Sequence, residues 1–246
     1  MISPMIPRCR YRVDPIRSRE LAIAENPLND ASGGSGNRRK RSLGAVSKLW
    51  QPGRTLWVSF LGAPDRRLKM SIFELASQWL DLSGANLNMD LADDDDNKAT
   101  IRILAGAHLP HSESEIGTDA LAYNDETMCI NVPLGHDLFE QTVLHEFGHA
   151  LGAEHEHRHP DADIPWNEQV VLQSYMAVPG WTETDVRQQV LNKCDDVGLR
   201  KTAYDRTSIM HYPVPQGFTH GDWEVGLNRE LSEKDLEFMR LAYPHD

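Results

Sequence analysis

The stretch His145-Glu146-Phe147-Gly148-His149-Ala150-Leu151-Gly152-Ala153-Glu154-His155 spaces three histidines as a metal site requires. His145 and His149 are four residues apart, so on a helix their rings project from the same face, one turn apart. Glycine accepts positive φ, so the helix can end at Gly152 and the chain can turn back to bring His155 to the same point. Three histidine ligands leave one position of a tetrahedral zinc ion open, which is the arrangement of catalytic zinc sites.

Glu146 directly follows the first of these ligands. At that position a carboxylate can lie beside a water molecule in the site without joining the ligand set, which is where a general base is needed. The flanking apolar residues recur at the spacing of a buried helix: Phe139, Val143, Leu144, Phe147, Ala150 and Leu151. The alternative is a helix with surface histidines, but that interpretation gives Gly152 no role.

A second motif, Ser208-Ile209-Met210-His211-Tyr212, follows farther along the chain. Together the two motifs resemble those of the astacin-like branch of the metzincin zinc endopeptidases. The resemblance implies that Met210 forms a turn beneath the metal and that Tyr212 is an extra, displaceable zinc ligand that can stabilise an oxyanion. It also implies that Glu156 forms a salt bridge with a mature amino terminus. Ordinary core packing is the alternative for Met210 and Tyr212.

The resemblance extends over about residues 49–244 and implies an α+β fold. The expected architecture is a metzincin-like (zincin) catalytic domain, with a twisted mixed β-sheet, two long helices above the cleft and an irregular, helical lower subdomain. We expect a flexible basic arm or propeptide-like segment at 1–48 and the catalytic domain at 49–246. Within that domain, the upper part is expected at 49–152 and the lower part at 153–246.

Local patterns predict the individual elements of this domain. Alternating or apolar runs indicate strands at 56–61, 86–91, 99–105, 120–123 and 128–132. Helical spacing indicates helices at 69–82, 167–177, 182–193 and 232–241, with a capping box that begins at Thr182. In the family, an edge strand before the zinc helix pairs with extended substrate, so the resemblance implies such a strand within 117–132.

Composition restricts the possible partners. The chain has 246 residues, of which 40% are hydrophobic and 25% charged, as in globular proteins. No apolar run reaches the roughly 20 residues that span a bilayer, and a net charge of −12 argues against nucleic acid. We therefore expect protein or peptide substrates, with no nucleic acid and no membrane as partner. Arginines interrupt any amino-terminal signal sequence, so the compartment stays open, although the resemblance favours an extracellular one.

The amino-terminal segment differs in charge from the rest. Residues 1–48 hold ten basic against four acidic side chains, so the remaining residues carry a balance of −18. Such an arm is either a solvated tail or a segment that docks on the acidic body, as a cleaved propeptide would. The segment 26–37, rich in Asn, Ser and Gly, indicates a linker, and Arg38-Arg39-Lys40-Arg41 is either a processing site or a solvated charge run.

Several other histidines, acidic residues and cysteines could bind a metal or form a disulfide, but none of them is assigned to the site. His157 and His159 are expected at the surface, because three ligands already fill the site, and His211 is expected to be packed or hydrogen-bonded. Asp93-Asp94-Asp95-Asp96 lacks the spacing and the glycine of a calcium loop, so it is interpreted as a solvated loop. The three cysteines, Cys9, Cys129 and Cys194, allow at most one disulfide, whereas astacins usually carry two.

The sequence thus predicts a zinc-dependent endopeptidase with one Zn²⁺ per chain, held by His145, His149 and His155, and with Glu146 as general base. Tyr212 is the second expected catalytic residue, and Met210 the structural methionine. A catalytically silent zinc-containing binding module is the alternative, although such a protein usually lacks the base or a ligand. The natural substrate and the oligomeric state stay open.

Overall fold

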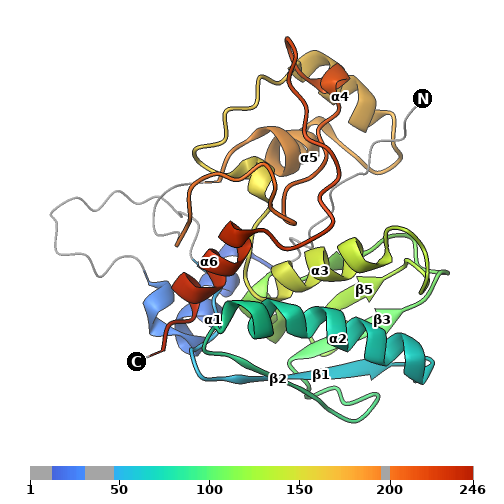
Figure 1. The fold of residues 1–246 in the computed structure, drawn as a ribbon, viewed down its shortest axis with the longest axis vertical. Coiled ribbons are helices and arrows are strands. Elements are labelled where there is room, and N and C mark those ends of the chain that lie inside the picture. The colour runs from blue at the N-terminus through green and yellow to red at the C-terminus, as the bar shows by residue number, and fades with distance from the viewer. Residues whose placement is uncertain (1–12, 31–46, 195–199, 246) are drawn as a thin grey trace, which may run out of the picture.

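A computed structural model describes residues 13–30, 47–194 and 200–245, and its centre is a five-stranded mixed sheet (Figure 1). The strands are β1 (Thr55–Leu61), β2 (Asn88–Leu91), β3 (Ile101–Ala105), β4 (Glu113–Ser114) and β5 (Met128–Ile130). Their order is β2-β1-β3-β5-β4, and only β4 runs antiparallel to its neighbour. The expected mixed sheet and α+β class are confirmed.

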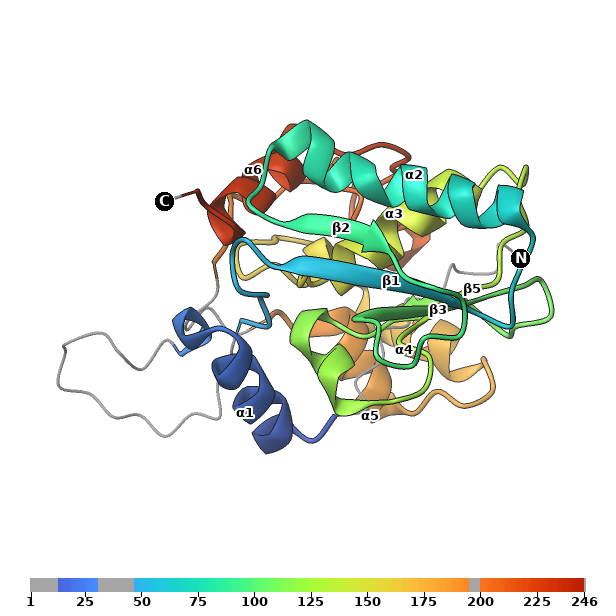
Figure 2. The same cartoon turned by 90° about the horizontal axis from the view of Figure 1, so that it is seen from below.

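Helix α2 (Arg66–Ser83) connects the parallel neighbours β1 and β2 as a crossover. The Asp65 carboxylate accepts hydrogen bonds from the first turn, and Gly84, with φ of 65°, ends the helix in the left-handed conformation. Its buried side chains, Ile72, Ala76, Trp79 and Ser83, follow helical spacing. This stripe packs α2 beside α3 (Phe139–Ala150) on one face of the sheet (Figure 2).

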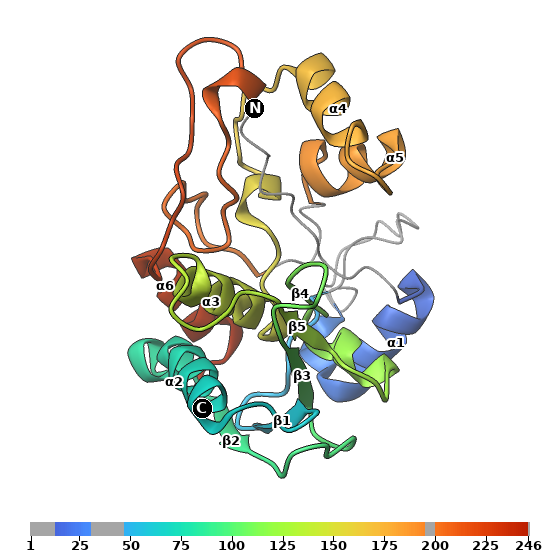
Figure 3. The same ribbon diagram turned by 90° about the vertical axis from the view of Figure 1, so that its right-hand side faces the viewer.

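The opposite face carries the short 3-10 helix η3 (Gly117–Ala122) and α1 (Pro15–Glu25) (Figure 3). The strand expected at 120–123 is therefore wrong. Arg102 belongs to β3 and is buried. Its guanidinium donates to the carbonyls of Ala99, Tyr123 and Asp125, and the last two of these bonds hold the 120–127 segment against the sheet. Because these interactions satisfy its carbonyls, the segment needs no strand partner.

The edge of the sheet also differs from the expectation. Of the two strands expected within 117–132, only β5 forms, and β4 pairs with it through Glu113 and Ser114. The end strand of the sheet on this side is therefore β4, which lies before that region, so the edge strand expected within 117–132 is wrong. With only two residues, β4 is too short to produce an alternating pattern in the sequence.

Residues 13–30 are docked on the rest of the chain, which agrees with a segment that docks on the acidic body and not with a solvated tail. Ser18 of α1 donates to the Asp119 carboxylate at 2.6 Å in a buried contact with η3. The Asn29 side chain, in the 3-10 turn η1 (Pro27–Asn29), donates to the Leu49 carbonyl at 2.8 Å. Most of the expected linker and all of Arg38–Arg41 lie outside the described residues, and the domain boundary at 48 stays a prediction.

The lower part contains short helices around its own apolar cluster. They are η4 (Glu156–Arg158), α4 (Glu168–Met176), α5 (Glu183–Val186), the π-helix η5 (Arg187–Leu191) and η6 (Gln216–Phe218). The cluster comprises Val171, Tyr175, Trp181, Val186 and Val190. The last helix, α6 (Glu233–Ala242), returns to pack on α2. The expected capping box at Thr182 is present, and Ser232 forms a second one at the start of α6. Among the described helices, none is long and apolar enough to cross a bilayer.

Candidate metal centre

Helix α3 (Phe139–Ala150) carries the first two histidines and is buried between α2 and the sheet. Three aromatic side chains satisfy its carbonyls. Trp79 donates to Leu144 within the helix at 2.9 Å, and Trp50 donates to the terminal Ala150 carbonyl at 2.9 Å. The Tyr243 hydroxyl donates to the Leu151 carbonyl at 2.7 Å. A buried helix end requires such partners, and these fix where α3 stops.

The chain reverses at Gly152, as the sequence predicts. Its φ is +91°, and the amides of Gly152 and Ala153 donate to the carbonyls of His149 and Gly148 at 2.8 and 2.9 Å. These two hydrogen bonds form a Schellman motif, the usual way in which glycine ends a helix. Because the helix ends here, His155 returns toward the rings of His145 and His149.

Gly152→Ala is expected to destabilise this turn. The left-handed conformation costs an alanine about 1–2 kcal/mol, and the added Cβ would lie 2.9 Å from a Leu49 methyl group and 3.2 Å from the Lys48 carbonyl oxygen. We expect a lower urea midpoint for the metal-free protein and weaker zinc binding. Gly226→Ala is the control, since a Cβ there meets no atom within 4 Å. Equal midpoints for the two variants would contradict the prediction.

The three imidazoles converge on one buried point. The Nε2 atoms of His149 and His155 are 3.1 Å apart, and one donor atom from each of the three rings lies within 4.8 Å of the others. Nitrogens bound at ~2.0–2.1 Å to a tetrahedral zinc ion are about 3.3 Å apart, so this spacing suits zinc. The Nε2 atom of His145 is buried and bonds to none of the residues that the structure describes. A metal ion would satisfy it.

Hydrogen bonds fix the tautomers of two of these rings. The Nδ1 atom of His145 donates to the Ile209 carbonyl at 2.9 Å, and that of His149 to the Ala153 carbonyl at 2.8 Å. Since a carbonyl only accepts, each Nδ1 carries the hydrogen and each Nε2 keeps a lone pair for a metal.

Burial also keeps the rings neutral. It lowers the pKa of His145 to about 3, that of His149 to about 4, and that of His155 well below the usual value. The other histidines of the centre lower the pKa of His145 and His155 further. A neutral imidazole is the form that binds a metal, so the centre is ready to accept a cation near neutral pH.

The second motif lies directly beneath this centre. Met210 is buried against the helix, and a Cβ on Gly148 would lie 2.3 Å from its sulfur. Gly148 therefore makes room for Met210, a role that the sequence analysis did not assign, although the position is visible in the first motif. The Glu156 amide donates to the Met210 carbonyl at 3.0 Å, which joins the turn to the residue after the third histidine.

Of the two side chains expected to act in catalysis, Tyr212 contacts the histidine rings and Glu146 is buried on the same helix as two of them. Glu146 is buried on α3 next to His145. The ring centroid of half-buried Tyr212 lies 5.0 Å from that of His145 and 4.5 Å from that of His155. The structure thus brings the three histidines and Tyr212 together, and it places Glu146 on the helix that carries two of those histidines.

The expected surface positions of His157 and His159 are wrong, since both are buried. His157 Nε2 donates to the Gln189 carbonyl at 3.0 Å and His159 Nε2 to the Thr202 carbonyl at 3.1 Å. Segments distant in the sequence thus cover the turn after the third histidine. His211 is hydrogen-bonded, as expected, through the Tyr204 hydroxyl at 2.7 Å.

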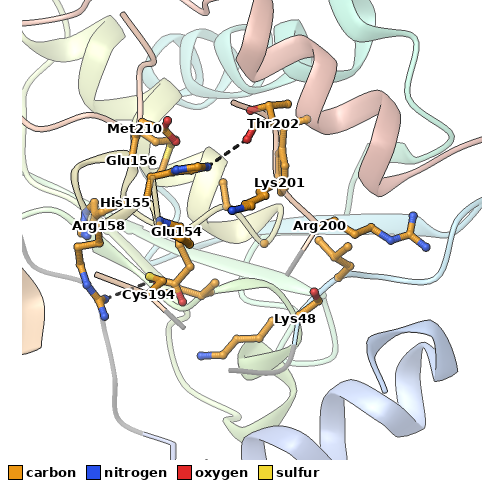
Figure 4. Close-up of a pocket in the computed structure, with 18 of the residues that line it drawn as sticks. Lys48, Glu154, His155, Glu156, Arg158, Cys194, Arg200, Lys201, Thr202 and Met210 are labelled. Carbon is orange, nitrogen blue, oxygen red and sulfur yellow. Dashed lines mark hydrogen bonds and ion pairs between the residues drawn. The ribbon is translucent and has the colours of Figure 1, made fainter. Parts of the chain in front are cut away.

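A cavity of about 520 Å³ lies beside His155, with Lys48, Glu156, Lys201 and Met210 among the residues around it (Figure 4). Burial raises the pKa of Glu156 to about 8, against the hydrogen bond that one of its oxygens accepts from the Asp205 amide at 2.7 Å. The salt bridge that the resemblance implies for Glu156 stays a prediction. Cys129 and Cys194 form no disulfide with each other, and Cys9 lies outside the described residues.

Comparison with solved structures matches most of the chain. It resembles myroilysin at 31% identity with a TM-score of 0.74, over 81% of this chain and 97% of that one. It also resembles high choriolytic enzyme 1, a hatching enzyme zinc-protease from the medaka fish Oryzias latipes. That match has 17% identity and a TM-score of 0.52, over 81% and 92% of the two chains, so it concerns the fold alone.

This chain also matches parts of two longer proteins. A bone morphogenetic protein 1 homolog of Strongylocentrotus purpuratus is 32% identical over 135 residues, which are 48% of this chain. The zinc metalloproteinase dpy-31 of Teladorsagia circumcincta is 24% identical over 241 residues, which are 90% of this chain. The chain spans 20% and 35% of the lengths of these two proteins.

Three buried imidazoles, on a helix and the turn that follows it, form a group that could hold a metal ion above a mixed sheet. The family model described as Astacin, a peptidase family, matches residues 127–244, which include both motifs. With the match to myroilysin over nearly all of that chain, this shows that the protein belongs to the astacin family of zinc metalloendopeptidases.

Proposed function

We propose that His145, His149 and His155 hold one zinc ion per chain and that the protein hydrolyses peptide bonds there. The observation that carries the proposal is the buried convergence of three neutral rings, with two Nε2 atoms 3.1 Å apart and the Nε2 atom of His145 without a hydrogen-bond partner among the described residues. Zinc supplies Lewis-acid chemistry at such a site, making water acidic enough to attack near neutral pH and polarising carbonyl groups.

Glu146 is the proposed general base. Its carboxylate is buried on the helix that carries two of the ligands, one residue after His145 and outside the ligand set. It accepts a proton from the attacking water and later donates that proton to the leaving amine. A carboxylate can do both because protonation leaves an O–H donor where an acceptor had been.

Tyr212 is the proposed donor to the oxyanion. Its ring lies against His145 and His155, so its hydroxyl would be close to a substrate carbonyl that binds at the proposed metal. A phenol held by packing donates a hydrogen bond to negative charge that develops during attack, with little reorganisation.

We propose that the substrate is an extended protein or peptide segment that pairs with the edge strand β4. Among the described strands, β4 is the end strand of the sheet and pairs with β5 alone, so a peptide strand would be added on its other side. Main-chain pairing holds a peptide without regard to most of its side chains, which suits an endopeptidase.

Metal removal tests this function directly. Purified protein should contain about one zinc per chain and should cleave denatured casein. A chelator such as 1,10-phenanthroline should abolish cleavage, and added zinc should restore it. Cleavage that continues after the metal has been removed would contradict the proposal. Because residues 13–30 dock on the domain, the assay is run with the full chain and with the chain trimmed to residue 49, which shows whether the arm restrains activity.

A further inference from the structure

We propose that Asp235, on α6, is a positioning residue that aims the His145 ring and thereby sets how tightly the centre holds its metal. The inference rests on the proposed metal site. Asp235 lies 90 residues from His145 in sequence and belongs to neither motif, so nothing in the sequence patterns connects the two. The connection passes through the peptide group of Ile209.

The carboxylate of Asp235 is buried and holds the turn of the second motif from one side. One of its oxygens accepts from the Ser208 hydroxyl at 2.6 Å. The other accepts from the Ile209 amide at 2.9 Å and from the Ser232 amide at 2.8 Å. The Ser208 oxygen accepts in turn from the Met210 amide at 3.0 Å. The carboxylate thus fixes both Ser208 and Ile209.

The same residue, Ile209, supports the ligand from the other side. Its carbonyl accepts the Nδ1 hydrogen of His145 at 2.9 Å, while its amide is bound to Asp235. Hydrogen bonds to a carboxylate are stronger than neutral ones, and linked hydrogen bonds polarise one another. Asp235 therefore sets the position of the carbonyl that orients the His145 ring.

An asparagine at position 235 shows why two carboxylate oxygens are needed there. Asparagine has the size of aspartate but replaces one oxygen by an NH₂ group, which donates. If the NH₂ group faces Ile209 and Ser232, two amide donors lose their acceptor. If it faces Ser208, it donates to the hydroxyl oxygen, and the oxygen left for Ile209 and Ser232 belongs to a neutral amide, which is a weaker acceptor than a carboxylate. In either orientation the support of His145 weakens although the side chain keeps its volume.

Asp235→Asn is therefore expected to weaken zinc binding. Outer partners of metal ligands typically change metal affinity about 10- to 100-fold, and we expect a rise of about 10-fold in the zinc Kd, since this partner acts through a peptide group. The Kd is measured by competition with a chromophoric chelator. The cobalt(II)-substituted protein should also show a changed visible absorption spectrum, which reports the ligand geometry. Unfolding of the metal-free protein in urea measures any structural loss separately.

Asp185→Asn is the matched control. Asp185 closes the same kind of capping box at the start of α5, where its carboxylate accepts from the Thr182 amide and hydroxyl at 2.8 and 2.5 Å. This box lies at the surface, and its hydrogen bonds stay within residues 182–185. Its variant should lose a similar cap while keeping the zinc Kd and the cobalt spectrum of the parent protein.

Ser208→Ala provides a second variant if Asp235→Asn does not fold. It removes one of the hydrogen bonds to the carboxylate and should raise the zinc Kd by a smaller factor. Unchanged Kd and cobalt spectrum in these variants, with stability lost only in the metal-free protein, would overturn the inference. If the parent protein itself binds no zinc, the proposed function fails. If the parent binds zinc and the variants bind it equally well, only the role of Asp235 fails.

Discussion

Glu146→Gln should retain about one zinc per chain and lose about 10²–10⁴-fold in peptidase turnover, the range that a positioned general base contributes. The substitution leaves the three histidines and the Gly152 turn unchanged, so the metal should stay bound. Glutamine has nearly the same shape as glutamate, but its amide cannot take a proton from water. Zinc content by atomic absorption and kcat/KM on a fluorogenic peptide test the two halves of this prediction.

Glu140→Gln controls for loss of a carboxylate from the same helix. Glu140 lies in the first turn of α3 and is exposed, so its variant should keep both the zinc and the activity of the parent. An active Glu146→Gln enzyme would refute the assignment of the base. Loss of zinc together with activity would show that Glu146 supports the site instead.

The elements predicted correctly are those with strong local patterns. Helix α2 has a buried stripe, a capping aspartate and a terminal glycine within its own sequence, so no distant contact is needed to recognise it. The capping box at Thr182 and the end of α3 at Gly152 are equally local. The proposed metal ligands share this advantage, because all three lie within one helix and the turn that follows it.

The predictions that failed concern segments whose conformation is set by distant partners. Residues 120–122 form part of η3, and Arg102, on β3, holds the carbonyl of Tyr123 directly after it. His157 is buried because Gln189 and its neighbours cover it. Residues 13–30 dock through several buried polar contacts, one of which, between Ser18 and Asp119, joins segments about 100 residues apart. A short polar contact of that kind leaves no periodicity in the sequence.

Tyr212→Phe should reduce kcat by about 10²–10³-fold, the usual effect of removing one donor to an oxyanion. Phenylalanine keeps the ring against His145 and His155 and removes only the hydroxyl. Because that hydroxyl is expected to act on charge that develops during attack, KM and zinc content should change little. Steady-state kinetics with a fluorogenic peptide and zinc analysis of the same preparation separate these quantities.

Tyr175→Phe is the control, since Tyr175 is buried in the apolar cluster of the lower part, against Trp181 and Phe218. It should leave kcat unchanged. A zinc Kd that rises in step with the fall in kcat would make Tyr212 a metal ligand at rest, because loss of a ligand weakens binding before any chemistry occurs. A parental kcat in Tyr212→Phe would exclude the oxyanion role altogether and leave the ring only its packing against the histidines.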